Sequence, residues 1–199
     1  MTATELANRL RAQFGTVLSE PTEFRGETTL TLSDPDRIAD VCKFAKAELG
    51  FDLLLDITSI DNYGVEPRWT VVYLLYNLKH NCHLRISTSV SEAKSELPTV
   101  TGVWHGADWH EREVYDMMGI RFVGHPDLRR ILMWDGYPYF PLRKDFPLAG
   151  RSSEVPGVAF SRPAPLEGGP FVTVPGDKNA IEREPRVRNP QNQKGVQKQ

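Results

Sequence analysis

The chain has 199 residues, 40% of them hydrophobic and 25% charged, so it is long enough for one folded domain with a substantial core. Its formal net charge of -2 at pH 7 argues against a general nucleic-acid-binding protein, which needs a basic surface. No apolar run approaches the roughly 20 residues of a membrane-spanning helix, and we expect no secretory signal at the start. Cys42 and Cys82 are far apart in sequence, so we expect no iron–sulfur cluster or thiolate zinc site in this chain alone.

Two helices are predicted in the first 50 residues. Apolar side chains recur at helical spacing over residues 6–14, and Thr4 is expected to cap this first helix. The pair Asp34-Pro35 is typical of a helix start, and Gly50 is expected to end this second helix.

Strands are predicted around and after the second helix. Residues 28–32 form a short candidate, and residues 51–60 form an apolar run that ends in a turn sequence. Residues 69–76 are almost continuously apolar, which predicts a strand with both faces covered, and residues 84–90 alternate as a half-buried strand does. Short links between the last three imply antiparallel neighbours. The predicted fold class is α+β, with a mostly antiparallel sheet and helices packed on one side of it.

A third helix is predicted from Asp108, which we expect to act as a cap with Glu111 reaching back, to a stop at Gly119. Three consecutive charged residues begin at Glu111 and spread over roughly 200° of the helix surface. At least one charge is therefore expected at a buried margin, where it needs a partner. Arg112 and Asp116 stand four residues apart and are predicted to pair with each other.

The chain changes character after this helix. Residues 120–150 combine prolines with large apolar side chains and arginines, which predicts an extended docking segment appended to an α+β domain of residues 1–119. Residues 151–199 are a Pro/Gly-rich tail, and its last part is expected to be mobile.

Three sequence blocks point to a known family. Residues 109–120 read WHEREVYDMMGI, residues 124–132 read GHPDLRRIL, and residues 141–147 read PLRKDFP. In this order and spacing they resemble the signature of the 30 kDa subunit family of respiratory complex I, the C subunit of NADH-quinone oxidoreductase. The resemblance implies a non-catalytic structural subunit in the hydrophilic arm of proton-translocating NADH:quinone oxidoreductase.

The same resemblance implies how the chain would work within that complex. Electrons pass from NADH through FMN and iron–sulfur clusters in other subunits to quinone, so no cofactor, metal or catalytic residue is expected in this chain. The implied partners are other complex I subunits, especially the D subunit, with a peripheral location at the cytoplasmic face of the cell membrane and membrane association only through the complex. The residues expected at subunit interfaces are Trp109, Glu111, Arg112, Glu113, Asp116, His125, Asp127, Arg129, Arg130, Arg143, Lys144 and Asp145.

Other functions remain open on the residues alone. The same fold could serve a related membrane-bound hydrogenase or ferredoxin-linked complex. A metal enzyme built on the His/Glu cluster around residue 110 is disfavoured, because the spacing matches neither His-Glu-x-x-His nor Glu-x-x-His. The sequence contains no Gly-x-Gly-x-x-Gly or Walker motif, so no nucleotide site is predicted.

Overall fold

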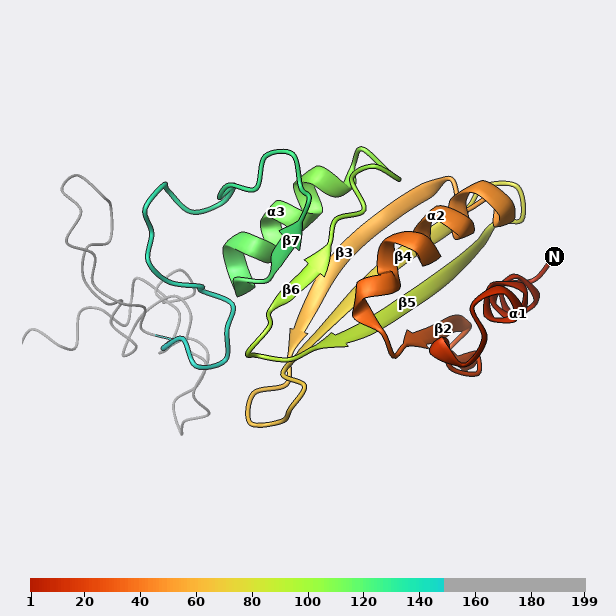
Figure 1. The fold of residues 1–199 in the computed structure, drawn as a ribbon, viewed down its shortest axis with the longest axis horizontal. Helices are drawn as coiled ribbons and strands as arrows, with labels where there is room; N and C mark the ends of the chain where they lie inside the picture. The colour runs from red at the N-terminus through yellow and green to blue at the C-terminus, as the bar shows by residue number, and fades with distance from the viewer. Residues whose placement is uncertain (149–199) are drawn as a thin grey trace, which may run out of the picture. The chain divides into compact units, whose positions relative to one another are not determined.

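A five-stranded sheet in the order β1-β2-β5-β4-β3 forms the body of the protein (Figure 1). The computed structural model describes residues 1–148, within which Met1–Asp145 make one compact unit. Neighbouring strands are antiparallel except for the parallel pair β2–β5, so the prediction of a mostly antiparallel sheet is confirmed. The strands are β1 (Thr22–Phe24), β2 (Glu27–Leu32), β3 (Leu53–Asp61), β4 (Trp69–Asn77) and β5 (Cys82–Val90).

The helices are α1 (Ala3–Phe14), α2 (Ile38–Leu49) and α3 (Ala107–Met118), with short 3-10 turns at Gly15–Val17 and Pro35–Arg37. The predicted cap Thr4 is wrong, because Thr2 accepts the backbone N–H of Glu5 at 3.2 Å while the Glu5 carboxylate accepts that of Thr2 at 2.9 Å. This reciprocal pair satisfies two of the free donors at the start of α1.

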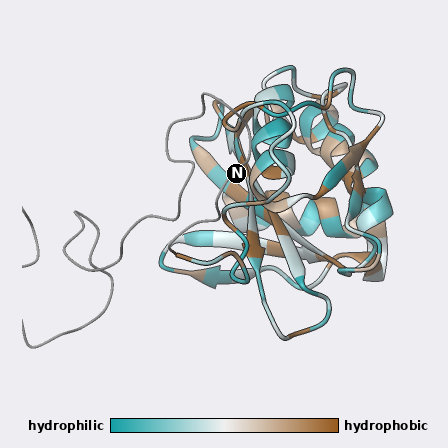
Figure 2. Cartoon of the chain, turned by 90° about the vertical axis from the view of Figure 1, so that its left-hand side faces the viewer, coloured by the Kyte–Doolittle hydropathy of each residue, from teal (hydrophilic) through white to brown (hydrophobic). Residues whose placement is uncertain are grey.

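The core lies between the three helices and one face of the central strands. Alternate residues of β4 and β5 are buried on that face, from Trp69 to Leu75 and from Leu84 to Val90. The opposite face of β4 is half-buried, so the predicted cover of both faces is complete on one side and partial on the other within residues 1–148. Figure 2 shows the helices banded hydrophilic and hydrophobic, as expected of helices that cover a core with one side.

The structure also has a second, two-stranded sheet that was not predicted from the sequence. β6 (Glu96–Pro98) and β7 (Arg121–Val123) run parallel and bury Leu97 and Phe122. Three-residue strands show too little alternation to be detected. Because Ile120 and Phe122 belong to the main core, the predicted boundary at residue 119 does not separate two compact units.

The chain after β7 has neither helix nor strand over residues 124–148, as predicted for an extended segment. We call residues 124–145 the C-terminal segment, since they complete the compact unit. The predicted tail, residues 151–199, lies outside the described residues.

Candidate functional site

The candidate site is a group of buried charged side chains on α3. Glu111, Arg112 and Asp116 are all buried, which confirms the prediction that this helix places charge at a buried margin. Their partners differ from those predicted. Each of the three side chains binds a segment outside α3 and not a residue of its own helix.

Glu111 fastens the chain around residue 100 to α3. Its carboxylate accepts the backbone N–H of Val100 at 2.7 Å and the Thr99 hydroxyl at 2.5 Å. The predicted capping box is therefore wrong: Gly106 occupies the cap position, and Asp108 lies within the helix. Burial raises the pKa of Glu111 to about 7 although both hydrogen bonds oppose the shift, and the nearby Asp108 adds to it.

Asp116 organises the C-terminal segment. One carboxylate oxygen accepts the backbone N–H groups of Ile131, Leu132 and Met133 at 3.1, 2.7 and 2.8 Å, and the other binds the Arg130 guanidinium. Burial alone would raise the pKa of Asp116, but these donors outweigh it and hold that pKa below its usual value.

The predicted pair of Arg112 with Asp116 is wrong. Arg112 donates to the backbone carbonyls of Arg129 and Arg130, each at 3.2 Å, and its guanidinium lies 5.4 Å from the centre of the Trp109 ring. The C-terminal segment carries free carbonyl and N–H groups that must be satisfied when they are buried. Arg112 therefore binds the carbonyls of the segment while Asp116 binds its N–H groups.

His125 makes a third connection between α3 and the segment. Its ring is fully buried, and its Nε2 lies 3.1 Å from the Asp108 carboxylate, 3.3 Å from the Asp108 carbonyl and 3.9 Å from Glu111. The Nδ1 atom accepts the backbone N–H of Asp127 at 3.0 Å, so a neutral ring carries its proton on Nε2, toward Asp108.

The end of the segment is held at the edge of the sheet. Arg68 makes two parallel bonds of 2.9 Å to Asp61 and one of 3.1 Å to Asp145, while Asp61 also accepts the Lys144 backbone N–H at 2.8 Å. The bonds from Arg68 hold the pKa of Asp61 below its usual value. Asp61 and Arg68 were not among the predicted site residues, although opposite charges on the two sides of a predicted turn were the available signal.

Arg143 joins this end of the segment to α3. It donates to the Met118 carbonyl at 2.6 Å, and its guanidinium lies 5.0 Å from the Trp69 ring centre and 4.3 Å from that of Phe140. Burial lowers the pKa of Arg143, and the neighbouring charge of Arg68 adds to that effect.

Four predicted interface residues have exposed side chains outside the hydrogen-bonded contacts described above. Trp109 is 61% exposed and Glu113 is exposed, while Asp127 and Arg129 pair with each other at the surface at 2.8 Å. Most of the predicted interface residues therefore make contacts within the chain, whereas the side chains of these four lie at its surface. Whether any of the twelve contacts a neighbouring protein of an assembly stays a prediction.

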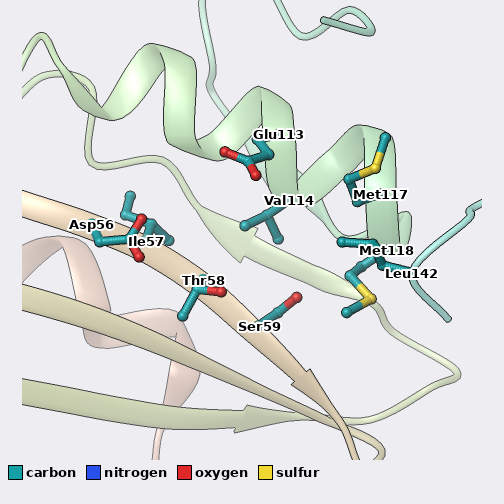
Figure 3. Close-up of a pocket in the computed structure, with 9 residues that line it drawn as sticks. All are labelled: Asp56, Ile57, Thr58, Ser59, Glu113, Val114, Met117, Met118 and Leu142. Carbon is teal, nitrogen blue, oxygen red and sulfur yellow. The ribbon is translucent and has the colours of Figure 1, made fainter. Parts of the chain in front are cut away.

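A groove opens between α3 and the edge strand β3. Figure 3 shows Asp56 and Glu113 toward one end and Met117, Met118 and Leu142 toward the other. Its walls are Asp56–Ser59 of β3, Glu113, Val114, Met117 and Met118 of α3, and Leu142.

Metal-binding side chains are not clustered within residues 1–148. No group of three or more His, Cys, Asp or Glu side chains there is placed to hold a metal ion. Cys42 and Cys82 are free, and burial raises the pKa of both thiols, so neither forms a thiolate ligand readily. No described helix is long and apolar enough to cross a bilayer.

The fold and these contacts define a class of protein: an α+β domain whose buried charges fasten its own extended segment across one helix. The sequence matches the family described as "Respiratory-chain NADH dehydrogenase, 30 Kd subunit" over residues 31–152. The chain belongs to this family.

Individual relatives agree with the family match. The C subunit of NADH-quinone oxidoreductase from Geotalea uraniireducens is 47% identical over 146 residues, which cover 73% of this chain and 88% of that protein. One of the C subunits of the same enzyme from Rhizobium meliloti is 48% identical over 135 residues, covering 67% and 74%.

Two solved structures share the fold. The trypsin-resistant fragment of Nqo5 superposes with a TM-score of 0.56 at 31% identity, covering 64% of this chain and 100% of the fragment. A chain of the membrane-bound sulfane sulfur reductase, an archaeal respiratory membrane complex, gives a TM-score of 0.63 at 25% identity, covering 72% and 85%.

Proposed function

We propose that this chain is the C subunit of a proton-translocating NADH:quinone oxidoreductase, where it acts in the hydrophilic arm as a structural subunit without cofactor or catalytic residue of its own. The relatives that are named as C subunits of NADH-quinone oxidoreductase support the assignment to that complex. The observation that carries the structural role is the use of the buried charges. Glu111, Arg112 and Asp116 all bind other parts of the chain, which leaves none of them free for a substrate.

The proposed partners are the other subunits of the complex, the D subunit among them, and the proposed location is the cytoplasmic face of the cell membrane. Exposed Trp109 supports a protein partner, because a large aromatic ring stacked on a fixed arginine loses little conformational freedom when it is covered. FMN and the iron–sulfur clusters would lie in partner subunits.

Purification of the tagged chain from mildly solubilised membranes tests this function. We expect the chain to bring down the D subunit, flavin, iron and NADH:quinone reductase activity in fixed ratio. Recovery of the chain alone, or with proteins that have no such activity, would contradict the proposal.

A related membrane-bound complex is the second candidate, since the archaeal sulfane sulfur reductase contains a chain of the same fold. The same purification separates the two candidates, because only the first predicts NADH oxidation by the recovered complex.

A further inference from the structure

The outer edge of β3 is a long strand edge with large apolar side chains. β3 stands last in the sheet order, and no strand within residues 1–148 pairs with its outer side. Leu53, Leu55 and Ile60 are 41%, 39% and 50% exposed. Soluble proteins usually blunt such an edge with charge, proline or a bulge, because its unpaired backbone groups recruit another strand.

The bulge in β3 disrupts only the start of the strand. The register shifts between Leu54 and Asp56, but every residue from Asp56 to Asp61 then pairs in order with β4. The second half of β3 is therefore a regular strand, able to accept a further strand along its open side.

The helix α3 and the edge of β3 enclose a groove that is acidic at one end and apolar at the other. Figure 3 shows Asp56 and Glu113 toward one end and Met117, Met118 and Leu142 toward the other. Methionine side chains adapt to differently shaped apolar groups, which suits them to receive a side chain from another chain.

The acidic end has no lysine or arginine partner within residues 1–148. Glu113 is exposed and forms no hydrogen bond or ion pair within residues 1–148, and no lysine or arginine lines the groove. Asp56 lies 3.2 Å from His110, yet its side chain remains 49% exposed.

We infer that an extended segment of a partner subunit adds to the outer edge of β3, placing a lysine or arginine against Asp56 and Glu113 and a large aliphatic side chain against Met117, Met118 and Leu142. Side chains two residues apart in a strand lie on the same face about 7 Å apart, so one short segment can supply both. This inference rests on the proposed function, since it names what one surface of the chain binds in the complex.

A second copy of this chain fits the groove poorly. Pairing of two β3 edges would bring Leu53–Asp61 of the partner copy into the groove, and that strand contains two aspartates and no basic residue. The acidic end would then meet further carboxylates and no lysine or arginine.

Cross-linking in the purified complex tests the contact directly. Ile60 is exposed and does not line the groove, so its replacement by the photoreactive p-benzoylphenylalanine leaves the site open. We expect irradiation to join position 60 to one partner subunit, at a peptide that carries a basic residue beside an aliphatic one in an extended stretch. We also expect β3 amide hydrogens to exchange at least about tenfold more slowly in the complex than in the isolated chain.

Charge reversal supplies the matched control. Glu113→Lys should lower the cross-link yield at least about fivefold, because it repels the basic residue of the partner. Glu48→Lys makes the same change on the exposed side of α2, outside the groove, and should leave the yield unchanged.

The outcomes separate this inference from the proposed function. A complex that purifies intact with NADH:quinone reductase activity, yet gives no cross-link at position 60 or links two copies of this chain, overturns the groove assignment alone. An equal loss of yield for Glu113→Lys and Glu48→Lys overturns it as well. If the chain brings down no complex at all, the proposed function fails and the inference fails with it.

Discussion

At the scale of single residues, the molecule depends on buried charges that are fully partnered. Asp116 is completely buried but receives three backbone N–H groups and a guanidinium, and Arg68 donates to both oxygens of one carboxylate. A buried charge is strongly unfavourable unless its hydrogen-bonding capacity is met. Loss of one partner therefore costs more than the pair itself contributes.

The substitution Asp116→Asn tests this dependence. It removes the charge opposite Arg130 and places an amide among the N–H groups of Ile131 and Met133, so we expect the free energy of unfolding to fall by about 3–5 kcal/mol. Asp127→Asn, the same change in an exposed pair, should cost under about 1 kcal/mol. Urea denaturation of both variants measures the difference, and equal losses would show that Asp116 does not hold the segment.

The pKa of Glu111, raised to about 7 from 4.5, predicts how stability changes with pH. The folded protein binds the Glu111 proton more tightly than the unfolded chain does, and this difference stabilises the folded state. The stabilisation is fully present below about pH 4.5 and is lost as pH rises through about 7. From the two pKa values, the loss amounts to about 3 kcal/mol.

Glu111→Gln should remove this contribution, because glutamine does not titrate. We expect the variant's unfolding free energy to change less between pH 5 and pH 8 than that of the parent protein. Denaturation at each pH measures this change, and an equal change in the two proteins would show that Glu111 does not cause the pH dependence.

At the scale of elements, α3 connects the domain to the C-terminal segment along its length and at its end. Carbonyls in the last turn of a helix lack partners within the helix. Here the Leu142 backbone N–H donates to the Met117 carbonyl at 3.2 Å, and Arg143 donates to that of Met118. The segment thus completes the helix end, with Gly119 in a left-handed conformation directly after it.

Gly119 should be sensitive to any side chain. Its φ is +79°, and an added Cβ would lie 2.8 Å from the Phe140 ring and closer still to the Arg143 guanidinium. Gly136 has a similar φ of +82° with open space around it, so Gly136→Ala should cost only the backbone strain, about 1–2 kcal/mol. Gly119→Ala should cost about 1–3 kcal/mol more from overpacking. Urea denaturation of the two variants checks this, and equal costs would mean that the segment is not seated at Gly119.

At the scale of the whole molecule, residues 1–145 make one compact unit that hydrogen-bonds its own buried charges. Its surface carries a strand edge, an exposed tryptophan and a groove that is acidic at one end. This distribution suits a protein that is stabilised by its internal contacts and binds partners through its exposed apolar and acidic groups.

The chain purified alone is predicted to be colourless and free of metal, since the cofactors are proposed to lie in partner subunits. Visible absorption and elemental analysis measure this, with the complex purified from membranes as the positive control. Flavin, iron or zinc retained in stoichiometric amount by the isolated chain would contradict the prediction.

The sequence by itself determined the local elements and the family. Helical spacing predicted α1, start and stop residues predicted α2 and α3, and apolar runs or alternation predicted the long strands. The three signature blocks indicated the family that the comparisons then showed. These features depend on neighbouring residues, so they can be predicted without tertiary information.

Only the tertiary structure decided which charges meet. Arg112 and Asp116 stand at ideal spacing for a helical pair, yet Arg112 binds carbonyls 17 and 18 residues away and Asp116 binds N–H groups up to 17 residues away. The pairing of β6 with β7 and the groove beside β3 were equally hidden. The physical reason is that buried backbone groups of an irregular segment must be hydrogen-bonded, and this requirement outweighs the small stabilisation of an exposed pair within one helix.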